Sequence, residues 1–168
     1  GNLYAESGIC PFVCETKGIT TSRTYTDNVL KTYTRSEFSE HNPSYAYGSY
    51  TLDGRTYYAY GYGLAQWTTE GRKANYYNYV GQQHIGDTSP SVGFMVHELQ
   101  ASYPTVWNAL TGATDIKTAS TVVLTKYEIP YDQSSAVQIK RANYGVDVYN
   151  DFSGGKWEKY PTGGGGGG

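Results

Sequence analysis

The 168-residue sequence has few charged residues and few cysteines, and each shortage excludes a class of protein. Charged residues make up only 17% of the chain, the formal net charge is −2 and no basic stripe is present, so nucleic acid is not expected as a partner. No apolar run approaches the roughly 20 residues that a membrane-spanning helix needs. Cys10 and Cys14 are too few for a disulfide framework, and no Cys/His cluster has zinc-site spacing. We therefore expect no metal, no cofactor and no membrane span.

Tyrosine is the residue that the chain has in excess, with 19 copies in an aromatic content of 15%. Its side chain combines a flat apolar face with a hydroxyl group. Exposed tyrosines suit proteins that bind sugars, pack against other proteins or belong to virions. Tyrosine also fills half-buried sheets. Composition alone leaves both interpretations open.

Apolar spacing predicts a mostly helical α+β fold with one β-hairpin between helices. Helices are predicted over residues 1–7, about 27–39, 70–80, about 90–103, 106–110, 115–129 and 135–153. The run Thr121–Val123 leaves a strand as the alternative for residues 115–129. Strands are predicted near 45–51 and 55–61, on both sides of Asp53-Gly54. The glycines of residues 161–168 predict a flexible linker or tail.

Glu6 stands at the end of the first predicted helix, just before Ser7-Gly8. The C-terminus of a helix carries partial negative charge and favours Lys or Arg over Glu. An acid at this position is either a solvent-exposed residue at a fraying end or a residue kept there for a function. This stretch alone does not decide between the two.

A second stretch, Gly61-Tyr62-Gly63-Leu64-Ala65-Gln66-Trp67, follows the predicted hairpin. Goose-type lysozymes and lytic transglycosylases share a Glu-Ser pair at a helix end and a Gly-Leu-Met-Gln-type motif after a hairpin, and the two stretches together resemble them. The phage tail lysozyme family is more similar still. The similarity rests on Asn2–Gly8, Gly61–Thr68, Gly71–Lys73, Glu98-Leu99, Tyr103-Pro104 and Tyr127–Pro130, in that order. It extends from residue 2 to about residue 152.

This resemblance implies a lysozyme-like catalytic domain over residues 1–160, with the N-terminal helix truncated relative to the family. It also implies a peptidoglycan glycosidase that cuts between N-acetylmuramic acid and N-acetylglucosamine, with Glu6 as general acid. Such an acid must hold a proton beside the leaving oxygen. Desolvation and a helix C-terminus both favour a protonated carboxyl group. The unfavourable position of Glu6 is therefore what the reaction would need.

Four residues are assigned to substrate binding: Ser7, Tyr62, Gln66 and Trp67. The amide of Gln66 can donate to and accept from an N-acetyl group or a sugar hydroxyl. Its alternative is a glutamine bonded to backbone. Tyr62 and Trp67 could stack on sugar rings, and Trp67 is equally expected in the core.

Other charged residues of the motifs have simpler explanations. Arg72 and Lys73 are expected on a solvated helix face, with contact to peptidoglycan carboxylates as the lesser alternative. Glu98 and Glu128 are expected to be structural.

The second catalytic group is less well defined than the first. A retaining glycosidase needs a carboxylate at about 5 Å from the acid, and an inverting one at about 6.5–9.5 Å. Asp53 of the hairpin is the candidate, although Asp-Gly also suits a turn for conformational reasons. Glu15 and Asp27 are further candidates. A lytic transglycosylase needs no second carboxylate, because the 6-hydroxyl of the sugar attacks.

The partners that the resemblance implies are peptidoglycan glycan strands, other phage tail proteins and a second wall-degrading domain after the glycines. The expected location is the virion, at the phage tail tip, during viral entry. The first alternative is a non-catalytic wall-binding or structural virion module on a lysozyme-like scaffold. The second is a wall peptidase that uses Cys10 or Cys14 with one of His41, His84 and His97.

Overall fold

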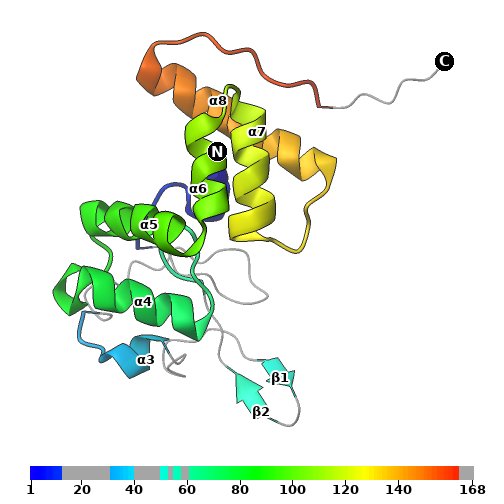
Figure 1. Ribbon diagram of the computed structural model, residues 1–168. Coiled ribbons are helices and arrows are strands. Elements are labelled where there is room, and N and C mark those ends of the chain that lie inside the picture. The colour runs from blue at the N-terminus through cyan, green and yellow to red at the C-terminus, as the bar shows by residue number, and fades with distance from the viewer. Residues whose placement is uncertain (13–30, 40–49, 53–54, 58–60, 163–168) are drawn as a thin grey trace. The chain divides into compact units, whose positions relative to one another are not determined.

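The part of the chain that the structure describes is mostly helical, as its apolar spacing predicts. In the computed structural model the described residues are 1–12, 31–39, 50–52, 55–57 and 61–162 (Figure 1). The helices are α1 (Asn2–Ser7), α3 (Arg35–Ser39), α4 (Glu70–Val80), α5 (Thr88–Ser102), α6 (Pro104–Gly112), α7 (Ile116–Val123) and α8 (Ser135–Ser153). A 3₁₀ turn, η1 (Gln82–His84), follows α4, and a π-turn, η2 (Leu124–Glu128), continues α7. No helix within these ranges has the length and apolarity to cross a membrane.

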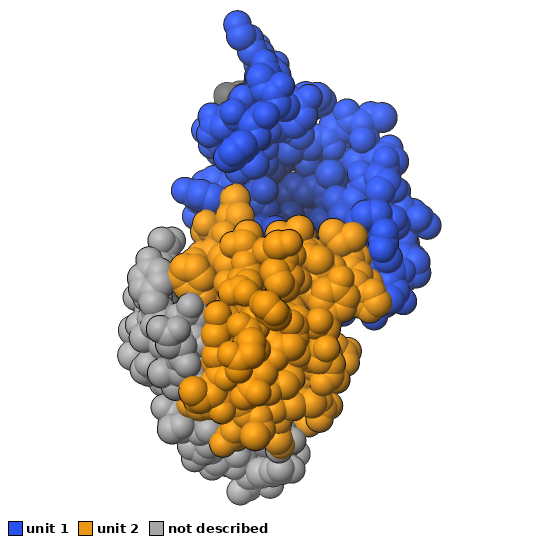
Figure 2. Space-filling view, turned by 90° about the vertical axis from the view of Figure 1, so that its left-hand side faces the viewer, with its two compact units in different colours: residues 1–5, 98–168 blue, residues 6–97 orange. Residues whose placement is uncertain are grey.

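The chain divides into two compact units (Figure 2). Unit 1 comprises residues 1–5 and 98–168, and unit 2 comprises residues 6–97. The division falls within α1 and within α5, so both units contain part of each helix. The single lysozyme-like domain over residues 1–160 and the flexible segment 161–168 stay predictions.

Helix starts follow the capping residues that the sequence carries. Thr69 caps α4, where its hydroxyl accepts a hydrogen bond from the N–H of Arg72, and α4 has the predicted bounds. Ser134 caps α8 in the same way, and Gly154 ends that helix with a φ of 67°. Asp115 caps α7 through a bond of 2.8 Å from the N–H of Thr118. A side-chain oxygen at such a position satisfies a backbone donor that the helix itself leaves unpaired.

Helix α3 begins later than the helix predicted over about 27–39. Residues 13–30 lie outside the described part, and the next four residues, 31–34, form turns and irregular chain. The helix begins at Arg35 because Thr34 and Glu37 form a capping box. The Thr34 N–H donates to Glu37 Oε2 at 2.7 Å, and the Glu37 N–H donates to Thr34 Oγ1 at 3.3 Å. The Thr34 N–H and the Thr34 hydroxyl both donate to the Glu37 carboxylate, and these two bonds hold the pKa of Glu37 below its usual value.

Two prolines lie at helix boundaries. Pro104 separates α5 from α6 and opens α6 at its first turn, where a missing N–H costs no hydrogen bond. Pro130 follows the end of η2, whose cap Ile129 has a left-handed φ of 48°. The strand alternative for residues 115–129 is wrong, because Ile116–Glu128 is helical throughout.

Two short strands pair where the sequence predicts a hairpin. Strands β1 (Tyr50–Leu52) and β2 (Arg55–Tyr57) are antiparallel, with Tyr50 opposite Tyr57 and Leu52 opposite Arg55. This register leaves two residues, Asp53 and Gly54, to connect the strands, and both lie outside the described residues. The complete hairpin, its longer strands and the α+β class therefore stay predictions.

Aromatic rings form the core of unit 2. The fully buried Trp67 packs on Tyr76 and Phe94, with ring centroids 4.9 and 5.0 Å away. Phe38 from α3 meets the ring of Tyr62 edge-on at 5.2 Å. The Tyr76 hydroxyl lies 2.9 Å from Ser91 Oγ, and burial raises the pKa of Tyr76. Tyr76 is thus a core residue with a bonded hydroxyl group.

The prediction that Lys73 lies on a solvated helix face is wrong, because this residue is buried. Its side chain is 0% exposed, on the face of α4 that also buries Ala74, Tyr76 and Val80. A buried lysine is rare in proteins, and its charge normally requires partners. Arg72, the neighbouring residue, is only half-buried.

Unit 1 packs α7 against α8. A Cβ atom on Gly145 would lie 2.8 Å from Ile116 Cγ2, so the glycine allows this close approach. Asn2 Nδ2 donates to both the carbonyl and the hydroxyl oxygen of Ser120, at 3.0 and 3.1 Å, which ties α1 to α7. Glu98 is buried and accepts a bond of 2.7 Å from the Tyr127 hydroxyl, which is consistent with the structural role predicted for it.

We expect Tyr127→Phe to destabilise the fold by about 1–3 kcal/mol, because it removes a donor to a buried carboxylate. Tyr131→Phe, at a fully exposed ring, is the matched control and should leave stability within about 0.5 kcal/mol. Urea denaturation followed by circular dichroism measures both. Equal midpoints for the two variants would contradict the role of the Tyr127–Glu98 bond.

Candidate functional site

Glu6 lies on the last turn of α1, as the sequence predicts. Its side chain is half-buried. The helix stops directly afterwards because Gly8 and Ile9 both have left-handed φ values, of 65° and 62°. Gly8 takes this conformation without steric cost, whereas a β-branched residue such as Ile9 adopts it rarely. The chain therefore turns sharply away immediately after the Glu6-Ser7 pair.

The second motif forms a closed turn. Tyr62 and Trp67 exchange two backbone hydrogen bonds, of 3.2 and 3.0 Å, which close the turn at its base. Gly63 has a φ of 77°, and a Cβ atom there would lie 2.9 Å from the Trp67 ring and 3.3 Å from the Pro11 carbonyl oxygen. Only glycine satisfies both the backbone and the packing at this position. Every residue of the turn, Tyr62–Trp67, is buried.

One hydrogen bond joins the two motifs. Ser7 Oγ donates to the carbonyl oxygen of Leu64 at 2.9 Å, and both residues are buried. Segments 57 residues apart in sequence are thereby brought together beside Glu6. Ser7 is predictable as a site residue from the sequence, but its acceptor, the Leu64 carbonyl oxygen, is not. Every residue has a carbonyl oxygen, so no sequence signal distinguishes that of Leu64.

The side chain of Gln66 is bonded to the backbone, as the alternative to a substrate-binding role predicts. Its Nε2 donates to the Gly63 carbonyl oxygen at 2.8 Å, and the residue is 9% exposed. Its φ of 47° is left-handed. The non-glycine residues with positive φ in the described ranges are Ile9, Gln66 and Ile129, and two of them border this site. Unfavourable backbone conformations of this kind concentrate at functional sites.

Tyr62 and Trp67 are core residues, each 0% exposed. The core alternative for Trp67 is therefore confirmed. Stacking on a sugar requires a ring face that the sugar can reach. Neither Tyr62 nor Trp67 has such a face, because both side chains are fully buried. Both rings instead support the turn that carries Gln66.

The residues proposed as a second catalytic group, Asp53, Glu15 and Asp27, lie outside the described residues. Cys14 and His41 do as well, while Cys10 is half-buried. His84 contacts Asp87 at 2.9 Å, and this bond helps to hold the pKa of Asp87 below its usual value. Within the described ranges, no three His, Cys, Asp or Glu side chains gather as a metal site would require.

Comparison with known proteins agrees with this pair of motifs. Neither curated proteins nor solved structures yielded a match to the chain. A family model described as phage tail lysozyme matches residues 1–152, a range that includes both motifs. The chain therefore belongs to the phage tail lysozyme family.

Proposed function

We propose that the chain is a peptidoglycan glycosidase of a phage tail that cleaves the bond between N-acetylmuramic acid and N-acetylglucosamine, with Glu6 as general acid. Membership of the phage tail lysozyme family supports a lysozyme-like role on peptidoglycan. The structural observation that carries the assignment of Glu6 is the Ser7–Leu64 bond. It anchors the end of α1 to the turn of the second motif, so the residue before Ser7 has a fixed position.

The proposed reaction begins with proton transfer from Glu6 to the bridging glycosidic oxygen. The bond to the leaving sugar then breaks through an oxocarbenium-like transition state. Water can complete the reaction by hydrolysis, or the 6-hydroxyl of the muramic acid can attack to give a 1,6-anhydro product. Asp53 stays the proposed second carboxylate of the hydrolytic route, and the anhydro route needs none.

The remaining site residues have proposed supporting roles. Ser7 positions the end of α1, and Tyr62 and Trp67 hold the turn in shape from the core. Gln66 is proposed to contact the substrate from this turn, although its Nε2 already donates to Gly63. Preorganised groups on a rigid support are what such a reaction requires.

The proposed setting is the virion tail tip, where the enzyme opens the host cell wall during entry. Other tail proteins are proposed as partners, together with a second wall-degrading domain after the glycines. A family of phage tail proteins is consistent with this location.

Mass spectrometry of digested peptidoglycan tests the proposal. We expect glycan fragments with intact stems, ending in reducing N-acetylmuramic acid for hydrolysis or in 1,6-anhydro-N-acetylmuramic acid for transglycosylation. Free peptides would instead indicate a peptidase or amidase. Binding to cell walls without any released fragment would overturn the proposal in favour of a non-catalytic wall-binding module.

A further inference from the structure

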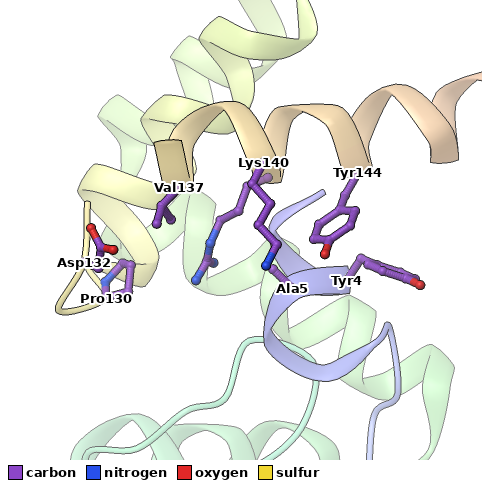
Figure 3. A pocket seen from close by; sticks show the side chains of 8 residues that line it. Tyr4, Ala5, Pro130, Asp132, Val137, Lys140 and Tyr144 are labelled. Atoms are coloured by element: carbon purple, nitrogen blue, oxygen red, sulfur yellow. The ribbon is translucent and has the colours of Figure 1, made fainter. Parts of the chain in front are cut away.

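A pocket of about 350 Å³ opens in unit 1, between α8 and the middle of α1, at Tyr4 and Ala5 (Figure 3). Its residues come from three segments: α1, the chain before α8, and α8 itself. The volume is at the lower end of the range for small-molecule sites. It suits a short branch of a substrate better than a run of sugar rings. Ala5, in the lining, directly precedes Glu6 in the chain.

Cationic side chains outnumber carboxylates in the lining. Lys140 and Arg141 contribute two positive charges, against the single carboxyl group of Asp132. The Asp132 carboxylate already accepts a bond of 2.9 Å from the N–H of Ser134, before the first turn of α8. Figure 3 shows the Lys140 side chain extending from α8 toward Ala5 in α1. The pocket therefore favours an anionic group at the Lys140 ammonium.

The rest of the lining is apolar or aromatic. Val137, Pro130 and Ala5 contribute aliphatic surface. Tyr4 and Tyr144 form a tilted ring pair with centroids 4.9 Å apart. A ligand that matches this pocket has small aliphatic groups next to a carboxylate. Inorganic phosphate or a bare sugar provides only part of that combination.

We propose that this pocket binds the peptide stem of peptidoglycan, with a stem carboxylate at Lys140. The inference rests on the proposed function, because it assigns a second part of the same substrate to this chain. The sugar rings of the glycan carry neutral hydroxyl and N-acetyl groups. The lactyl-peptide branch is the part that carries both methyl groups and carboxylates, and it therefore matches the lining.

Two substrates test the proposal: glycan strands with stems, and the same strands stripped by an N-acetylmuramoyl-L-alanine amidase, which removes the stem carboxylates and leaves only the lactyl carboxylate. Both are freed of phosphate polymers. For each enzyme the measured quantity is KM on stripped strands divided by KM on strands with stems. We expect Lys140→Met to lower this ratio roughly tenfold, toward one, because a charge-assisted contact is lost. Lys140→Arg should restore most of it. Lys156→Met, which removes an exposed charge elsewhere in unit 1, is the matched control.

Co-sedimentation with sacculi gives a readout that is independent of catalysis. In the Glu6→Gln background, we expect Lys140→Met to weaken binding to sacculi with stems and to equalise it with binding to stripped sacculi. An unchanged ratio and unchanged binding in Lys140→Met overturn the stem pocket while leaving glycan cleavage standing. Binding that needs wall phosphate polymers also overturns it. If the wild type cleaves no glycan but still binds sacculi in a stem-dependent way, the proposed glycosidase activity is wrong and the stem pocket stands.

Discussion

Replacing Glu6 by Gln is expected to abolish clearing of cell-wall suspensions while the fold survives. The substitution keeps the size and shape of the side chain and removes the proton that the proposed mechanism transfers to the leaving oxygen. General acid catalysis contributes about 10²–10⁴-fold to enzyme rates, so a fall of that order is expected. Release of glycan fragments, quantified by mass spectrometry, measures it. Circular dichroism and the urea midpoint establish that the variant is folded.

The control for this result is Glu158→Gln, which makes the same chemical change at an exposed site in unit 1. We expect it to clear walls at the wild-type rate. Undiminished lysis by Glu6→Gln would remove Glu6 from the mechanism. Loss of lysis in both variants would point to a general effect of charge on wall binding instead.

Replacing Gly63 by Ala is expected to open the turn that carries Gln66 and to reduce lysis with it. Two costs add at this position. A left-handed φ is unfavourable for alanine by about 1–2 kcal/mol. The new methyl group would lie 2.9 Å from the Trp67 ring and 3.3 Å from the Pro11 carbonyl oxygen, and overpacking of this kind costs about 1–3 kcal/mol. The expected loss is therefore about 2–5 kcal/mol in all.

Gly154→Ala separates these two costs. Gly154 has a similar φ of 67°, but a Cβ atom there meets no described atom within 4 Å. Only the backbone cost applies, so we expect a loss of about 1–2 kcal/mol and normal lysis. Urea denaturation compares the two variants directly. Equal destabilisation would mean that the Trp67 ring yields to the methyl group without cost.

Local signals allowed most helix boundaries to be predicted from the sequence. Thr69, Ser134, Pro104 and Gly154 act through their own backbone or their nearest neighbours, so the sequence is sufficient for them. The start of α3 at Arg35 follows from another local signal, the capping-box spacing of Thr34 and Glu37. The helix predicted over about 27–39 is wrong at residues 31–34, because this cap outweighs a short apolar pattern.

The site was predictable only in part, for a different reason. Glu6, Ser7 and the second motif were recognisable as a pair of patterns. The Ser7–Leu64 bond uses a backbone acceptor, which looks the same at every position. The burial of Lys73 and Tyr62 is set by which faces pack together in three dimensions. The sequence around Lys73 is equally compatible with a solvated helix face. It therefore cannot specify that this side chain is buried.

The position of Trp67 also gives the site its own optical reporter. The chain has three tryptophans, and the other two, Trp107 and Trp157, belong to unit 1. In a double variant that lacks both, selectively excited tryptophan emission would arise from unit 2 alone, from an indole ring shielded from water. A red shift of that emission would signal opening of the turn around Gln66, whereas circular dichroism averages over all helices. If the urea transitions followed by tryptophan emission and by circular dichroism coincide, the two units unfold as one cooperative system.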